Sequence, residues 1–225
     1  MTTNQVCNGR DANKVNASCP KAPGCPVLRE GPAPREVCGL GQEMKIKALV
    51  LALGDISTDT KIKAAKRLAQ VGGVSEIGPL AAACWGDKEM VAALKALVER
   101  HGEEGLGELG MMARETEGAY WTVLSVARAA SAVKSPKAVD ILDAVAQRAV
   151  RDEIYGKPPE STLRKDMDYF VDIKIRKRAH LFGAILDAIE ELGVPACSAL
   201  VIERMLRSPD AVFYGINERA VALLS

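Results

Sequence analysis

The stretch Asp59–Ala93, DTKIKAAKRLAQVGGVSEIGPLAAACWGDKEMVAA, decides the fold because one pattern occurs in it twice. Residues 59–65 (DTKIKAA) place an apolar residue three positions after an aspartate and then two alanines, and residues 87–93 (DKEMVAA) repeat that order. Later apolar positions also correspond: Ile77 and Leu80 after the first copy, Leu106 and Leu109 after the second. Two helical segments repeated in this way predict stacked helix pairs.

Looser copies of the pattern continue toward the C-terminus. We expect a third unit from Thr116 to Val150, a fourth from Asp172 to Arg207, and a last helix from Pro209 to Leu224. Helix starts are signalled by short polar side chains, which accept hydrogen bonds from free amides, and by prolines, whose missing amide is not needed there. These starts are Asp87, Ser135-Pro136, Ser161 or Thr162, and Ser208-Pro209, and glycines such as Gly102 mark the stops.

The first 43 residues have a different composition. Four of the six cysteines and five of the eleven prolines fall there, and prolines and glycines at this density break helices and strands. From Met44 onward the apolar residues adopt helical spacing, with Ile46, Leu49, Val50 and Leu53 on one face. We therefore predict an irregular arm over residues 1–43 and a helical-repeat domain over residues 44–225.

These residues resemble the HEAT-like repeat family, particularly the short-repeat type of phycobilisome lyase subunits. The resemblance rests on the DxxI and paired alanines of residues 59–65, on Ile77-Gly78-Pro79-Leu80, and on Asp172-x-x-Ile175-Arg176, and it covers residues 55–207. It implies an all-α fold, a right-handed α-solenoid of antiparallel helix pairs, whose concave face usually binds other macromolecules. A few members handle chromophores or damaged DNA. An ordinary helical bundle is the alternative fold.

Charge and hydropathy narrow the class of protein. The chain carries 30 basic and 29 acidic side chains, a formal charge of +1, which argues against a nucleic-acid or anionic-membrane partner. Residues 1–10 lack the apolar core of a signal peptide, and no apolar run approaches the roughly 18 residues of a membrane span. We expect a cytoplasmic protein, in which cysteines stay reduced, bind metal or carry redox chemistry.

Cys7, Cys19, Cys25 and Cys38 form the candidate metal site. Their spacing matches neither a zinc ribbon nor a ferredoxin run, but four thiols are the number that a tetrahedral zinc site or an iron–sulfur cluster requires. The alternatives are free thiols on a partner-bound tail and a disulfide or thiol-exchange role. The other two cysteines, Cys84 and Cys197, are expected to be small core residues.

Lys174, Arg176, Lys177 and Arg178 form the densest basic run and are the candidate partner-binding residues. Asp172 precedes Arg176 by one helical turn in the favourable orientation, so a self-paired helix face is the simpler interpretation. Trp85 and Trp121 are expected to be packing residues, although paired aromatic residues near an acid are also what helical repeats use on alkylated DNA. His180 is expected at the edge of a packed face.

No catalytic motif emerges from this pattern. The sequence has no nucleophile elbow and no phosphate loop, and its two histidines are too few for a histidine metal site. The favoured function is a non-enzymatic scaffold or accessory subunit whose arm docks on another protein, such as a redox enzyme. The alternatives are a protein that binds metal or an iron–sulfur cluster through the arm cysteines, and a lyase or DNA-repair-like enzyme acting on the concave face.

Overall fold

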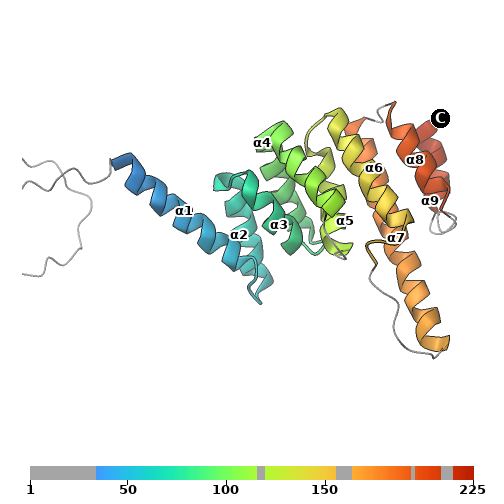
Figure 1. Ribbon diagram of the computed structural model, residues 1–225, viewed down its shortest axis with the longest axis horizontal. Coiled ribbons are helices and arrows are strands. Elements are labelled where there is room, and N and C mark those ends of the chain that lie inside the picture. The colour runs from blue at the N-terminus through green and yellow to red at the C-terminus, as the bar shows by residue number, and fades with distance from the viewer. Residues whose placement is uncertain (1–33, 116–119, 156–163, 194–195, 209–214) are drawn as a thin grey trace, which may run out of the picture. The chain divides into compact units, whose positions relative to one another are not determined.

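The computed structural model consists of helices joined by turns in the residues that it describes, which are 34–115, 120–155, 164–193, 196–208 and 215–225. No strand occurs in these ranges, so the all-α prediction is confirmed (Figure 1). Side chains are described from Gly41 onward. The contacts of the chain divide it into Met1–Gly39 and Leu40–Ser225, and the account below concerns the second unit.

The elements follow one another along the chain with short connections. They are α1 (Pro34–Ala52), α2 (Thr58–Val71), the 3₁₀ turn η1 (Val74–Glu76), α3 (Ile77–Ala83), α4 (Lys88–Glu115), α5 (Tyr120–Ala129), the 3₁₀ turn η2 (Ala130–Ala132), α6 (Pro136–Val150), α7 (Arg164–Leu192), α8 (Ser198–Leu206) and α9 (Ile216–Leu224).

Helix α1 begins inside the segment expected to be irregular. Pro34 occupies its first position, where the missing amide costs no hydrogen bond, and residues 34–43 are helical. The predicted apolar face of this helix is confirmed from Ile46 onward, because Ile46, Leu49 and Val50 pack against the core and Leu53 is buried. The remainder of the predicted arm, residues 1–33, lies outside the described residues.

The predicted helix starts at Asp87 and Ser135 are confirmed. Asp87 Oδ1 accepts hydrogen bonds from the backbone amides of residues 89 and 90, at 2.9 and 3.0 Å, and the Ser135 hydroxyl accepts one from the Lys137 amide at 3.3 Å. The prediction of one helix from Pro209 to Leu224 is wrong. Gly215 has a left-handed backbone, with φ of 69°, and α9 begins after it at Ile216, while residues 209–214 lie outside the described residues.

Helix α4 consists of two helical segments that meet at Gly102. There φ is 56° and ψ is −126°, a conformation that glycine adopts without the clash that a β-carbon would cause. The two segments approach closely just beyond this turn, since a β-carbon built on Gly105 would lie only 2.8 Å from the carbonyl oxygen of Val98. The predicted helix stop at Gly102 is therefore a sharp turn between two helices.

Polar contacts show the relative direction of two pairs of helices. Along α2 and the first segment of α4, Lys66 contacts Glu89 at 2.5 Å, and Arg100, further along, donates to the Ala69 carbonyl at 2.8 Å. The second segment of α4 and α6 show the same order. Their contacts are Glu103 with Lys137 and the Ala113 carbonyl with Arg148, both at 2.8 Å. Each pair is therefore parallel.

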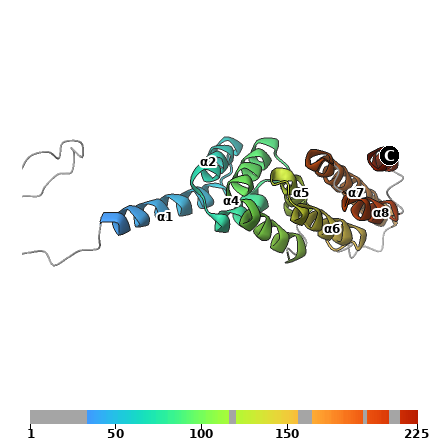
Figure 2. The same ribbon diagram turned by 90° about the horizontal axis from the view of Figure 1, so that it is seen from above.

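The core is formed by the apolar positions that the repeated pattern identifies. Ile77 and Leu80 have no exposed surface, and their counterparts Leu106 and Leu109 are 1% and 0% exposed. Equal burial at corresponding positions means that both copies present the same face to the core. Figures 1 and 2 show α5, α6 and α7 next to one another, and all three contribute to this core.

The N-terminal half of α7 extends beyond the helices beside it (Figure 1). Tyr169 there is 67% exposed, whereas Phe182, further along the same helix, is fully buried. Within the described residues, no helix is long and apolar enough to cross a membrane.

Candidate functional site

Most of the predicted metal site lies outside the described residues. Cys7, Cys19 and Cys25 precede them, and Cys38 lies in α1 among the positions whose side chains are not described. Among the described side chains, no group of three or more His, Cys, Asp or Glu residues is arranged to hold a metal ion. The arm cysteines therefore stay a prediction for zinc or an iron–sulfur cluster.

Cys84 and Cys197 differ, although both are predicted to lie in the core. Cys84 is fully buried, its thiol donates to the Leu80 carbonyl at 3.1 Å, and burial raises its pKa to about 12, so this prediction is confirmed. Cys197 is exposed, and the prediction for it is wrong. It is the residue directly before α8 and makes no side-chain capping hydrogen bond, and the following Ser198 takes the buried position.

The basic run 174–178 is divided among several local contacts. Lys174 and Arg178 both pair with Asp152, and Arg178 is only 5% exposed, with its guanidinium 5.5 Å from the centre of the Tyr155 ring. Arg176 pairs with Asp172 at 2.8 Å, as the sequence predicts. Lys177 instead lies over the Tyr120 ring, 5.3 Å from its centre. The four residues thus do not form one cationic patch.

A polar cluster that the sequence does not predict joins α5, α7 and the α3–α4 turn. Arg128 donates to the Gly86 carbonyl at 2.9 Å, and its Nη2 lies 3.0 Å from Nε2 of His180. The other ring nitrogen of His180, Nδ1, lies 3.0 Å from the hydroxyl of Tyr120. Arg128 therefore fixes both the turn at Gly86 and the position of His180.

The chemistry of Arg128 determines the tautomer of His180. A guanidinium only donates hydrogen bonds, so Nε2 must accept, and in the neutral ring Nδ1–H donates to Tyr120. Burial and the charge of Arg128 both lower the pKa of His180, which favours this neutral form. Burial also raises the pKa of Tyr120 to about 12, so its hydroxyl keeps its proton. The cluster is a positioning network without a titrating acid–base pair near pH 7.

Two exposed tryptophans lie beside this cluster. Trp85 is 68% exposed and Trp121 is 39% exposed, so the prediction that they are packing residues is wrong for Trp85 and only partly right for Trp121. The Trp121 ring covers Gly86, where a β-carbon would lie 3.2 Å from it. Trp85 has φ of 45°, an unfavourable backbone for a bulky residue. A sequence signal existed: an aromatic residue directly before a turn glycine has no helix face on which to pack.

We call the surface formed by Trp85, Lys88, Trp121, Arg128 and Lys177 the tryptophan face. A hollow of about 360 Å³ between α4, α5 and α7 adjoins it, with Lys88 and Arg128 on its rim. Its apolar lining comes from four small side chains, Val91, Ala92, Ala184 and Ala188. The tryptophan face and the hollow together offer aromatic, aliphatic and cationic groups to a ligand.

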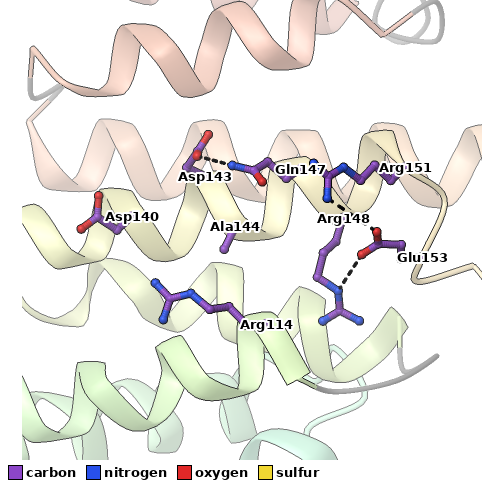
Figure 3. A pocket seen from close by; sticks show the side chains of 8 residues that line it. All are labelled: Arg114, Asp140, Asp143, Ala144, Gln147, Arg148, Arg151 and Glu153. Atoms are coloured by element: carbon purple, nitrogen blue, oxygen red, sulfur yellow. Dashed lines mark hydrogen bonds and ion pairs between the residues drawn. The ribbon is translucent and has the colours of Figure 1, made fainter.

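A second hollow, of about 420 Å³, lies along α6 (Figure 3). Its charged side chains largely satisfy one another. Asp143 accepts hydrogen bonds from Gln147 at 2.7 Å and from Arg204 of α8 at 2.8 Å, while Arg148 lies 3.6 Å from Glu153. Because these contacts, together with the hydrogen bond from Arg148 to the Ala113 carbonyl, join α4, α6 and α8, we interpret this hollow as part of the helix packing.

No protein-family model, curated protein or solved structure matches this chain. The geometry of its own side chains is therefore the basis for any functional conclusion. Within the described ranges that geometry brings exposed aromatic and cationic side chains close together on the tryptophan face.

Proposed function

We propose that this protein is a non-enzymatic scaffold or accessory subunit that binds another protein. The observation that carries the proposal is the exposure of Trp85 next to Gly86, whose carbonyl accepts a hydrogen bond from Arg128 of the tryptophan face. Tryptophan, tyrosine and arginine are the residues that contribute most to protein–protein affinity, and they do so as clusters on an otherwise polar surface. A monomer with no partner gains nothing from keeping a large indole ring in water.

The platform that we propose is a right-handed α-solenoid of HEAT-like antiparallel helix pairs. Two features favour it over an ordinary bundle. Helices of successive units run parallel to each other, α2 with the first segment of α4, and the second segment of α4 with α6. Two corresponding pairs of positions in the two clearest units are also equally buried, Ile77 with Leu106 and Leu80 with Leu109.

The N-terminal arm is the second element of the proposal. Its composition cannot form a core of its own, and we propose that it becomes ordered on the partner, for which a redox enzyme is our candidate. Since α1 begins at Pro34, deletion of residues 1–33 removes most of the arm and leaves the described helices intact.

The test is purification of the tagged full chain from its native cell under reducing conditions, followed by reconstitution with the purified candidate partner. We expect a stoichiometric complex by light scattering after gel filtration. The deletion of residues 1–33 should weaken binding by about tenfold, the effect of losing a moderate part of an interface. If no protein forms a reconstituted complex with the full chain, the scaffold function is refuted.

A further inference from the structure

The tryptophan face carries positive charge that the protein itself does not neutralise. Lys88, Arg128 and Lys177 form no ion pair with a carboxylate anywhere in the described ranges, and Arg128 uses only part of its fork on Gly86 and His180. A guanidinium has five N–H groups, so several are left for a ligand. This surface is therefore prepared to receive anionic groups.

The carboxylates nearest to the face do not cancel that charge. Asp187 and Glu191 line the adjoining hollow, but each already has a cationic partner. Arg219 contacts Asp187 at 2.7 Å, and Lys95 pairs with Glu191, which also accepts from the Ser131 hydroxyl. Although burial acts in the opposite direction, the hydrogen bonds from Lys95 and Ser131 lower the pKa of Glu191. Asp87, which lies between Gly86 and Lys88, has no ion pair within the described residues, so the face carries three cations and one unpaired carboxylate and is net positive.

The hollow supplies the apolar half of the binding surface. Val91 of α4 and Ala184 and Ala188 of α7 line the hollow and are 6%, 3% and 2% exposed. Small side chains in this position leave room for an aliphatic side chain of a ligand, and the exposed Trp85 lies in the turn directly before α4, whose first residue is Lys88. A carboxylate next to an apolar side chain would satisfy both halves at once.

We propose that the tryptophan face binds an acidic, partly apolar peptide segment of the partner protein. Carboxylates of the segment pair with Arg128, Lys88 and Lys177, an apolar side chain enters the hollow, and Trp85 covers the bound segment. This inference deepens the scaffold function and rests on it.

Charge complementarity favours an acidic peptide over two other possible ligands, the protein's own residues 1–33 and a nucleic acid. The protein's own residues 1–33 carry four basic side chains, Arg10, Lys14, Lys21 and Arg29, against only Asp11 and Glu30. They are repelled from a cationic face. A nucleic acid presents a continuous line of phosphates, which binds to a long basic strip, whereas this face offers three cations beside an apolar hollow that a phosphate backbone would leave unfilled.

The experiment pans a phage-displayed library of random peptides against the immobilised full-length protein. We expect enriched peptides to contain Asp or Glu next to a large apolar residue. One enriched peptide is then synthesised with a fluorescent label and titrated by anisotropy. Its affinity should fall by about tenfold in W85A and in K88E, and also with rising salt.

Matched controls separate this face from the rest of the surface. Tyr169→Ala removes an aromatic side chain that is 67% exposed on α7, close to the 68% of Trp85, and Lys63→Glu reverses an exposed charge on α2. Neither should change the affinity by more than about twofold. Circular dichroism and the melting temperature verify that each variant is folded.

Three results would overturn the inference: no enriched peptide, enriched peptides without acidic residues, or acidic peptides that bind W85A and K88E as tightly as the native chain. A labelled oligothymidylate that binds this face more tightly than the peptide would assign it to nucleic acid instead. If a reconstituted partner binds the native chain and both variants equally, the scaffold function stands and the peptide site does not. If the acidic peptide binds as expected but no partner complex forms, the peptide site stands and the scaffold function does not.

Discussion

Two glycines in the second segment of α4 provide a direct test of the packing. Gly105 is buried, and a β-carbon at this position would lie 2.8 Å from the Val98 carbonyl oxygen and 3.1 Å from the Val98 α-carbon. Gly107 lies two residues further along the same helix, is exposed, and has no atom within 4 Å of such a β-carbon. The same substitution, glycine to alanine, therefore meets backbone in one case and open space in the other.

The expected free energies follow from two opposing terms. Alanine is favoured over glycine inside a helix by about 0.5–1 kcal/mol, and this gain applies at both positions. At Gly105 the added methyl group collides with backbone atoms that cannot rotate away, and forced overpacking costs about 1–3 kcal/mol. We expect G107A to stabilise the protein by about 0.5–1 kcal/mol and G105A to destabilise it by about 1–2 kcal/mol.

Urea unfolding followed by circular dichroism at 222 nm measures both variants against the native chain. The midpoint is expected to rise for G107A and to fall for G105A with little change in slope, because the surface exposed on unfolding is nearly the same. A G105A protein as stable as G107A would refute the close approach of the two segments of α4, and with it the turn at Gly102.

Three other predictions concern titration, reactivity and a buried charge. The folded state lowers the pKa of His180, so the neutral ring stabilises the folded protein fully above the unfolded pKa of about 6.5. This stabilisation is lost as the pH falls from that value through the folded pKa. The melting temperature should therefore fall less between pH 7.5 and 5 in H180Q than in the native chain. Iodoacetamide should label Cys197 but not Cys84 in the native protein, as peptide mass spectrometry would show, since Cys84 is buried with a raised pKa. D152N should cost about 2 kcal/mol in urea unfolding, because it leaves Arg178 buried without its carboxylate; Asp152 is 43% exposed, which makes the loss smaller than for a fully buried pair. An unchanged midpoint would contradict that contact.

Local chemistry made part of this fold predictable from the sequence. A capping aspartate such as Asp87 or a turn glycine such as Gly102 acts on the backbone within a few residues, so the sequence alone identifies it. The repeated apolar positions also identified part of the core, such as Leu80 and Leu109, since helical periodicity requires only nearby residues, although Ala92 of the second copy is exposed. The dense prolines and glycines before residue 43 predicted an irregular arm, and this led us to expect helical structure only from Met44, although α1 begins at Pro34.

The tryptophan face was not predictable in the same way. It depends on Arg128 reaching the Gly86 carbonyl, a contact between residues far apart in the sequence, and no periodicity in one helix reveals it. The basic run 174–178 shows the opposite failure. Its residues are adjacent in the sequence, yet the fold directs Arg178 into the interior and Lys177 toward Tyr120.

Trp85 combines two features that each reduce stability. Its φ of 45° costs about 1–2 kcal/mol relative to an ordinary backbone, and its ring is left 68% exposed to water. Glycine at this position would relieve the strain at once, and the neighbouring Gly86 already adopts a φ of 80°. Strained residues with exposed aromatic rings persist where a binding role offsets their cost, as in sites that trade stability for function. The Arg128 guanidinium holds the same turn through the Gly86 carbonyl, so the strained residue that carries the indole ring is fixed next to a cation that we propose to bind the partner segment.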